Sequence, residues 1–403
     1  MLTRCRREPE DLRDRLLVVG AGPTGLAIAK AFGESGIPYL QVEATDHVGG
    51  NWAHGVYETA HIISSRRTTE YPDWPMPDSY PDFPSAVQMK AYYEAFADRF
   101  ELGRSIRFGT ELASASPEPG GGWLARFAGG EEVLVRGLVV ANGHHWSRSL
   151  PDWANDPACP VLHSKDYRSP DQLRGRRVLV VGGGNSGCDV VSEAARVAAS
   201  ADWSLRRGYW ILPKTLLGRP IVELLSPWLP IALQRLAIRA LLRVVIGRYE
   251  DYGLPRPDHR IFEAHPTVSN EVFHYLRHGR IRVRPDVESA EGGAVRFRDG
   301  STADYDLVVC ATGYEVALPF LPEGTVEVIG KTPQLYGGLV TDRHRHLYGA
   351  GAYQVRYGIG PLLRPLALLL ADWVRLQDEL AVPLGLALRE IGKRPPPSHL
   401  IEP

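Results

Sequence analysis

Residues 16–28 read LLVVGAGPTGLAI, and residues 178–190 read VLVVGGGNSGCDV. In both stretches an apolar run ends in glycines with the spacing G-x-G-x-x-G. Each stretch predicts a strand, a helix and a second strand, at 16–20, 23–35 and 38–43 in the first and at 177–182, 186–200 and 203–206 in the second. A glycine-rich turn inside such a βαβ unit is typical of dinucleotide binding. We therefore predict an α/β fold with two Rossmann-like dinucleotide-binding domains.

The glycines of the first loop have separate physical roles. Gly20 lets the chain turn sharply, Gly22 lets the backbone approach a pyrophosphate, and Gly25 lets the helix pack closely on the strand. The amides at the helix N-terminus and the positive end of the helix dipole then face the phosphates. Glu43, at the end of the next strand, can accept both hydroxyl protons of a ribose. The first loop is therefore predicted to bind a nucleotide.

The sequence GGNW at 49–52 follows this acid and points to a flavin. Its two glycines, Gly49 and Gly50, permit a second close approach of the backbone, here to the ribityl side of a flavin nucleotide. Trp52 either lines the edge of the isoalloxazine ring or is a core tryptophan. FAD is the ligand expected at the first loop.

The second loop repeats the glycine pattern but differs in the charge that follows it. Gly182, Gly184 and Gly187 occupy the three glycine positions, with Asn185 and Ser186 as polar groups expected near the phosphates. Where the first unit has Glu43, the second has Arg206 and Arg207. A guanidinium can pair with a ribose 2′-phosphate, which a carboxylate would repel. NADPH is therefore expected here rather than NADH; the other reading is two surface arginines without a ligand.

The bulk composition excludes several classes of protein. The 403 residues carry a formal net charge of −1, so no general attraction to nucleic acid is expected. No apolar stretch is long enough for a transmembrane segment, and the N-terminus does not resemble a signal peptide. The four cysteines are scattered, without CxxC or zinc spacing, so no metal site is expected. A cytoplasmic enzyme is the simplest reading.

The order of the patterns predicts one domain inserted in another. The FAD-binding domain is expected from 1–170 and 303–403, and the NADPH-binding domain from 171–302, with a helical insertion at about 215–262. Within this insertion, residues 230–247 predict a helix on which arginines recur every fourth residue. This helix is interpreted either as a membrane-surface or lid helix or as a helix packed on its own domain.

Taken together, these motifs resemble the flavin-containing monooxygenases, an FAD- and NADPH-dependent class that includes the Baeyer–Villiger enzymes. The resemblance covers roughly 16–360. It rests on motifs in the family's order, namely GAGPTG with Glu43, GGNW, DWPMP and YPDFP (73–84), NGHHW (142–146), HSKDYR (163–168), GGGNSG, the Arg206–Arg207 pair and ATGY (311–314). It implies a fold similar to glutathione-reductase-like flavoproteins, with the first loop, Glu43 and Trp52 on FAD and the second loop and its arginines on NADPH.

The resemblance also implies an activity. The reduced flavin of such enzymes adds O2 to give a C4a-(hydro)peroxyflavin, which inserts one oxygen atom into a small organic substrate. That substrate is a soft nitrogen or sulfur nucleophile, or a carbonyl. The sequence leaves open which of these chemistries applies, which substrate is used and whether the chain forms a homo-oligomer.

The chain departs from the family pattern at two places. In the identifying sequence FxGxxxHxxx(Y/F), His163 and Tyr167 are present, but Pro157 and Cys159 replace Phe and Gly. His163 is interpreted as a general acid or as a hinge residue.

The second departure is Ile63, which stands where many members carry an asparagine near the flavin. Ser64 and Ser65 are the candidate catalytic residues that would supply this polar contact. The departure leaves an alternative function, an NADPH-dependent flavin oxidase or reductase that releases hydrogen peroxide without oxygen transfer.

Overall fold

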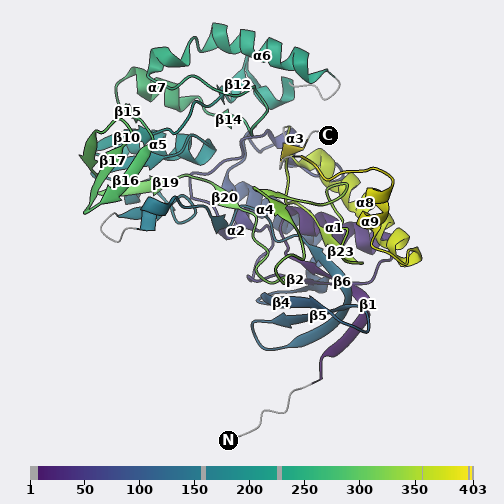
Figure 1. Cartoon of the computed structure of the whole chain (residues 1–403). Coiled ribbons are helices and arrows are strands. Elements are labelled where there is room, and N and C mark those ends of the chain that lie inside the picture. The colour runs from purple at the N-terminus through teal and green to yellow at the C-terminus, as the bar shows by residue number, and fades with distance from the viewer. Residues whose placement is uncertain (1–7, 156–159, 225–228, 356, 398–399, 402–403) are drawn as a thin grey trace, which may run out of the picture.

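The computed structural model describes residues 8–155, 160–224, 229–355, 357–397 and 400–401. Two α/β units lie beside one another, each built on its own β-sheet (Figure 1). The first unit, at the lower right of Figure 1, carries the first glycine loop, and the second unit, at the upper left, carries the second. The prediction of an α/β fold with two Rossmann-like units is therefore confirmed.

The sheet of the first unit has seven strands in the order β3-β2-β1-β6-β5-β4, with β23 paired to β6. The strands are β1 (Glu10–Val19), β2 (Tyr39–Val42), β3 (Ile106–Arg107), β4 (Leu112–Pro117), β5 (Trp123–Phe127), β6 (Glu132–Val140) and β23 (Leu347–Gly349). β1, β2, β3, β6 and β23 run parallel, so their carboxyl ends meet at one edge. The first loop follows β1 at this edge.

Helices cover one face of this sheet and bury the apolar side chains on that face. The helices of the first unit are α1 (Pro23–Ser35), α2 (Asn51–His54), α3 (Arg66–Thr69), α4 (Ala86–Arg99), α8 (Gly360–Glu379) and α9 (Leu384–Glu390). Leu26 and Phe32 of α1 and Leu370 of α8 are fully buried in one core. The two ends of the chain are thus joined by a shared hydrophobic core, which removes a large apolar area from water.

The sheet of the second unit has five parallel strands in the order β15-β10-β9-β19-β8. They are β8 (Val161–His163), β9 (Arg177–Val181), β10 (Ser200–Ser204), β15 (Ile281–Arg284) and β19 (Leu307–Cys310), with helices α5 (Asn185–Val197) and α7 (Glu271–Arg277) on one face. The other face packs against the antiparallel strands β16 (Val287–Glu291), β17 (Ala294–Phe297) and β18 (Thr302–Asp304). β9 is buried on both faces, as its unbroken run of valine and leucine requires.

Two strands of the second sheet lie outside the range 171–302 that the sequence suggested for this unit. β8 precedes residue 171 and β19 follows residue 302, yet β19 pairs with β9, with Val309 opposite Val180. A parallel partner is needed on that side of β9, because its backbone groups must be satisfied. We therefore propose that the second unit extends from β8 to β19, and that the FAD-binding unit consists of the segments before and after it.

The chain crosses between the units twice, and the two crossings form a ribbon. β7 (Ser147–Arg148) pairs antiparallel with β20 (Tyr314–Glu315). The remaining short strands are β11 (Ile211–Leu212), β12 (Thr215–Leu216), β13 (Arg219–Pro220), β14 (Thr267–Val268), β21 (Val328–Ile329), β22 (Thr332–Pro333), β24 (Gln354–Val355) and β25 (Leu400–Ile401).

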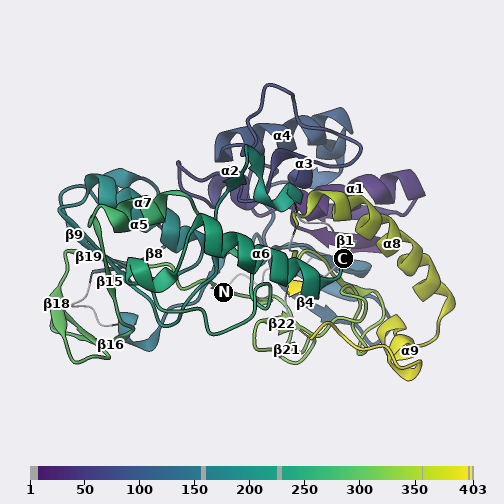
Figure 2. The ribbon, with the colours of Figure 1, turned by 90° about the horizontal axis from the view of Figure 1, so that it is seen from above.

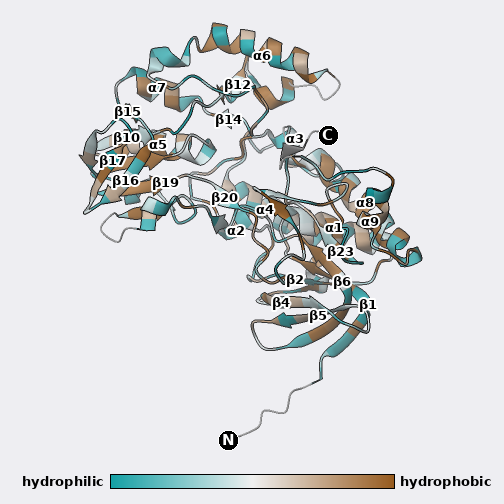
Figure 3. Ribbon diagram, in the orientation of Figure 1, coloured by the Kyte–Doolittle hydropathy of each residue, from teal (hydrophilic) through white to brown (hydrophobic). Residues whose placement is uncertain are grey.

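The predicted helix of the insertion is α6 (Ile231–Val245), which runs from the second unit across toward the first when seen from above (Figure 2). Ile238 and Leu242 are buried against the loop around Ile261, and Arg235 Nε donates to the Ile261 carbonyl over 2.8 Å. Hydrophobic and hydrophilic residues alternate along α6 (Figure 3). One face of α6 is thus packed on its own unit. Within the described residues, no helix has the length and hydrophobicity needed to cross a membrane.

The free energy of unfolding is expected to depend on pH through His346, which is 9% exposed. Burial, together with Arg136 nearby, lowers the pKa of its imidazole from 6.5 to about 4. The unfolded chain therefore takes up this proton near pH 6.5 and the folded chain only near pH 4. Stability is lost as the pH falls through this window, by about 2 kcal/mol between pH 7 and pH 5.

Urea unfolding of the wild type and of His346→Asn at both pH values measures this contribution. We expect the variant to lose less stability on acidification than the wild type. An equal loss in the two proteins would contradict the assignment.

Candidate active site

The first loop makes a turn that only glycines allow. Gly20 has φ +102°, and a Cβ on it would lie 2.6 Å from the carbonyl oxygen of Ala141, which follows β6. A Cβ on Gly25 would lie 2.1 Å from the carbonyl oxygen of Gly20. Backbone atoms at this separation cannot be pushed aside by rotating a side chain. The glycines therefore set how closely α1 approaches β1.

The second loop has the same geometry. Gly182 has φ +113°, and a Cβ on it would lie 2.4 Å from the carbonyl oxygen of Ala311, which follows β19. A Cβ on Gly187 would lie 2.1 Å from the Gly182 carbonyl oxygen. Each loop is thus clamped between its own helix and the strand next to its own strand. The two segments that share the sequence pattern G-x-G-x-x-G therefore also share the same close contacts within their βαβ units.

The helices that follow the two loops begin without a side-chain cap. Gly22 precedes α1 and Gly184 precedes α5, and neither offers a hydrogen-bond acceptor to the first amides of its helix. Of the other α-helices, α3 and α4 are capped by Ser65 and Ser85, and the rest also begin without a side-chain cap but do not follow a G-x-G-x-x-G turn. The first N–H groups of α1 and α5 are left for an outside acceptor, and phosphate oxygens are well suited to that position.

Glu43 and the GGNW segment lie beside the first loop. The buried Glu43 carboxylate accepts from the Ala21 amide over 2.8 Å and from the Thr45 amide over 3.0 Å. Gly49 donates its amide to the Ala21 carbonyl over 2.9 Å, and a Cβ on Gly50 would lie 3.2 Å from the Gly22 Cα. The GGNW backbone therefore lies directly against the first loop.

Trp52 is partly buried and packs against the cores of both units. The interpretation of Trp52 as a core tryptophan requires it to be enclosed in one core, and it is not. Its position at the junction of the two units is compatible with a flavin edge.

The end of β10 carries the two arginines expected to select NADPH. Arg207 has a buried Nε with no hydrogen-bond partner among the described residues, and its guanidinium lies 5.4 Å from the ring centre of Tyr209. A buried N–H donor without an acceptor is costly, so an anion bound there would stabilise this arrangement. Arg206 is exposed beside it.

Asp202, the acid of β10 that precedes these arginines, is already paired. Asp202, which is 7% exposed, binds Arg284 over 2.6 Å and accepts from the Tyr305 hydroxyl over 2.8 Å. Its charge is compensated within the protein, so it does not repel a 2′-phosphate as a free carboxylate would.

The structure gives Asn185 a different task from the one expected. Its side-chain oxygen accepts from the Val268 amide over 2.8 Å and its amide group donates to the Pro266 carbonyl over 3.4 Å. The side chain therefore holds the segment around β14, while the backbone of Asn185 begins α5 directly after the second loop. Ser186 lies beside Tyr57, at the junction with the first unit.

Comparison with known proteins identifies the family. Residues 13–345 match the family described as FMO-like, flavin-binding monooxygenase-like. The chain belongs to this family.

The relatives include the rice (Oryza sativa subsp. japonica) indole-3-pyruvate monooxygenase YUCCA1, 32% identical over 75% of this chain and 77% of that protein. Human flavin-containing monooxygenase 5 is 32% identical over 80% of this chain and 66% of its own length, so the chain spans about two thirds of that relative.

The fold recurs in solved structures. A flavin monooxygenase mutant from Stenotrophomonas maltophilia has a TM-score of 0.68 at 22% identity, covering 92% of this chain and 99% of that one. OTEMO in complex with FAD and NADP has a TM-score of 0.73 at 16% identity, covering 92% and 85%. The chain is thus an FAD- and NADPH-dependent monooxygenase.

In this flavin-binding monooxygenase, Ser64 and Ser65 form hydrogen bonds to threonines of α3. Ser65 is fully buried and caps α3, accepting from the Thr68 amide over 3.3 Å while Thr68 Oγ1 accepts from the Ser65 amide over 3.0 Å. Ser64 Oγ lies 2.7 Å from Thr69 Oγ1. The Ser65 hydroxyl is therefore engaged in a helix cap, and its catalytic role stays a prediction. Ser64 is partly exposed and stays a candidate.

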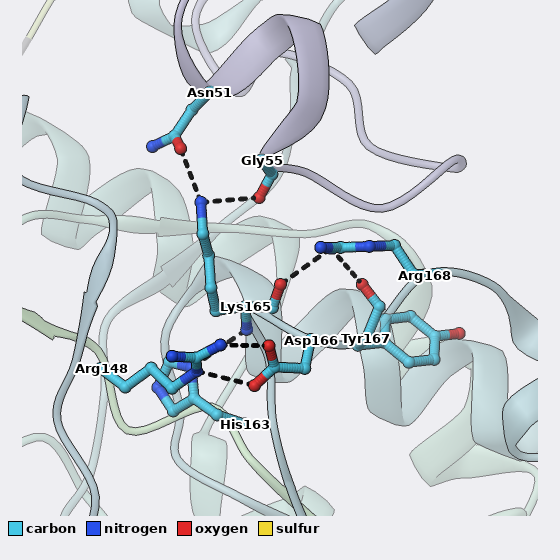
Figure 4. Close-up of polar contacts among 8 residues, drawn as sticks. All are labelled: Asn51, Gly55, Arg148, His163, Lys165, Asp166, Tyr167 and Arg168. Atoms are coloured by element: carbon cyan, nitrogen blue, oxygen red, sulfur yellow. Dashed lines mark hydrogen bonds and ion pairs between the residues drawn. The ribbon is translucent and has the colours of Figure 1, made fainter. Parts of the chain in front are cut away.

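The segment HSKDYR docks the second unit on the first (Figure 4). His163 Nδ1 accepts from the Lys165 amide over 3.0 Å, so Nε2 carries the proton and donates to the Gly313 carbonyl over 3.0 Å. Burial lowers the pKa of His163, which keeps the ring neutral. Both ring nitrogens are thus committed to backbone groups, one within HSKDYR and one just before β20. This supports the hinge interpretation of His163 over the general-acid one.

A contact missed by the sequence reasoning ties this segment to GGNW. Lys165 Nζ donates to Asn51 Oδ1 over 2.7 Å and to the Gly55 carbonyl over 3.3 Å (Figure 4). Asn51 Nδ2 donates to the His145 carbonyl over 2.8 Å. Burial lowers the pKa of Lys165. Asn51 thus bonds at once to HSKDYR and to the segment that precedes β7. In the sequence, the polar residues of GGNW and HSKDYR are the only feature that indicates a contact between these two motifs. Pro157 and Cys159, which replace the expected Phe and Gly, lie outside the described residues.

Proposed function

We propose that NADPH binds at the second loop and reduces FAD bound at the first, and that one atom of O2 is then transferred to a small organic substrate. The observation that carries this proposal is the pair of uncapped helix N-termini, one above each glycine turn, on two units that share a junction. A protein with one nucleotide site would need only one such turn.

The first unit is proposed to hold FAD. Gly20, Gly22 and Gly25 would bring the α1 amides to the pyrophosphate, and Glu43 would accept from the ribose hydroxyls. Gly50 would let the backbone approach the ribityl chain. Trp52, between the two cores, would line the edge of the ring system and exclude water from it.

The second unit is proposed to hold NADPH. Its glycines Gly182, Gly184 and Gly187 would place the α5 amides, including those of Asn185 and Ser186, at the pyrophosphate. A Cβ on Gly184 would meet nothing within 4 Å, so there is space above the start of α5. Arg206 and Arg207 would bind the 2′-phosphate, and the buried Nε of Arg207 would gain an acceptor.

Bound FAD would accept the hydride and activate dioxygen, which is chemistry that the side chains cannot supply. The chain's part is to orient both nucleotides and to keep water out. Cys188 and Cys310 are buried in separate cores, so they support no dithiol relay. The proposed substrate is a soft nitrogen or sulfur nucleophile or a carbonyl. A cytoplasmic location and a homo-oligomer remain predictions from the sequence.

Anaerobic mixing tests the first half of this proposal. The FAD-loaded protein is mixed with NADPH without oxygen, and the flavin absorbance is followed. We expect full bleaching of the flavin, faster with NADPH than with NADH. A flavin that dithionite reduces but NADPH does not would overturn the proposed pairing of the two sites.

A further inference from the structure

Helix α5, which starts at the second loop, carries two acids that meet the first unit. Asp189 and Glu193 lie four residues apart, so they share one face of the helix. Glu193 is only 3% exposed, and Asp189 is partly buried. Burial raises the pKa of both carboxyl groups. Acids in such a place need an explanation, because a buried carboxyl group is costly unless it is hydrogen-bonded.

The partners of these acids are hydroxyl groups from outside the second sheet and its helices. The Tyr57 hydroxyl donates to Asp189 Oδ2 over 2.6 Å. The hydroxyls of Thr59 and Tyr167 donate to the two oxygens of Glu193. Tyr57 and Thr59 belong to the segment that leaves α2 in the first unit, and Tyr167 belongs to HSKDYR. The rings of Tyr57 and Tyr167 contact each other, with centres 5.6 Å apart.

These bonds fix α5 more precisely than apolar packing alone. Tyr57 is 8% exposed and Tyr167 is fully buried, and Tyr57 belongs to the core of the second unit although it comes from the first. A hydroxyl-to-carboxyl bond has a narrow range of length and angle. Removing a hydroxyl would leave a buried acceptor unsatisfied, so the helix cannot slide along the segment without a penalty.

The position of these contacts relates them to both proposed nucleotide sites. Asp189 lies one turn after the first residue of α5, whose amides face the second loop. Tyr57 lies five residues after Trp52 of GGNW. The bonds therefore connect a rigid helix at one site to the segment that leaves the other.

We infer that Asp189 and Glu193 are positioning residues, which hold the NADPH-binding helix against the segment 57–59 so that the hydride donor reaches the flavin. The inference rests on the proposed function. Hydride transfer needs reacting atoms about 3–3.5 Å apart, and a displacement of about 1 Å can cost 100-fold in rate.

The test uses the FAD-loaded full chain and measures two quantities separately. Thr59→Val and Tyr57→Phe remove hydroxyls while keeping shape, singly and together. We expect the rate of anaerobic flavin reduction at saturating NADPH to fall about 10- to 100-fold in the double variant, while the Kd for NADPH changes less than about twofold. Thr59→Ser, which keeps the hydroxyl, should retain the wild-type rate, and Glu193→Gln, which keeps the shape and one of the two acceptor oxygens, should be faster than Glu193→Ala.

Tyr249→Phe is the matched control, because the Tyr249 hydroxyl is buried and donates over 2.9 Å to Ile211 within the second unit. It should reduce flavin at the wild-type rate. Unchanged reduction in Thr59→Val and in the double variant would overturn the inference, as would a loss confined to NADPH affinity or to melting temperature. If NADPH does not reduce the wild-type flavin, the proposed function itself fails, which is a distinct result.

Discussion

Gly187→Ala is expected to abolish reduction of the flavin by NADPH while leaving FAD bound. The new Cβ would lie 2.1 Å from the Gly182 carbonyl oxygen, which is a backbone atom and cannot rotate away. Either α5 moves off β9 or the second loop changes conformation, and in both cases the amides at the pyrophosphate are displaced. We expect the rate of anaerobic reduction to fall about 100-fold or more. Dithionite should still bleach the flavin.

Two further glycine variants make this result interpretable. Gly25→Ala makes the same clash in the first loop, 2.1 Å from the Gly20 carbonyl, and should instead release FAD. Gly33→Ala, in α1, meets nothing within 4 Å and should leave both sites intact. If Gly187→Ala retained NADPH-dependent reduction, the second loop would not be the site of the hydride donor.

Replacing Arg206 and Arg207 together by Ala is expected to remove the preference for NADPH. Each charge-assisted hydrogen bond to a phosphate contributes about 1.5–3 kcal/mol, so the Kd for NADPH should rise by about 100-fold or more. The Kd for NADH, which has no 2′-phosphate, should change little. Both constants are measured by titration of the FAD-loaded protein.

Arg174→Ala serves as the matched control for charge, because Arg174 is an exposed arginine of the same unit that pairs with Asp171 over 2.8 Å. It should leave both constants unchanged. Equal losses of NADPH and NADH in the double variant would contradict the assignment of the 2′-phosphate to these arginines.

The parts of the fold set by local chemistry could be predicted from the sequence. The close approaches at Gly25 and Gly187 require glycine at these positions. The glycine pattern in the sequence therefore predicts the two loops and the helices that follow them. The pairing of β19 with β9 was not, because parallel strands far apart in the chain carry no local mark of their partner. The expected limit at residue 302 fell before β19 for this reason.

The same distinction applies to the site. Ser65 is predicted as a catalytic residue, and its role as the cap of α3 is seen only in the structure, because Thr68 stands where a capping box usually has Glu or Gln. The bonds from Lys165 to Asn51 and from Tyr57 to Asp189 join residues more than a hundred positions apart. No period or motif in the sequence encodes such a contact. It arises only when the two units are docked.

Labelled dioxygen tests the central claim most directly. The protein with FAD, NADPH and a panel of amines, sulfides and ketones is incubated under 18O2, and the products are analysed by mass spectrometry alongside hydrogen peroxide. We predict one labelled oxygen atom per product molecule for at least one substrate, with product formed in proportion to the NADPH consumed. Hydrogen peroxide equal to the NADPH consumed, with no labelled product from any class in the panel, would contradict oxygen transfer and indicate an oxidase instead.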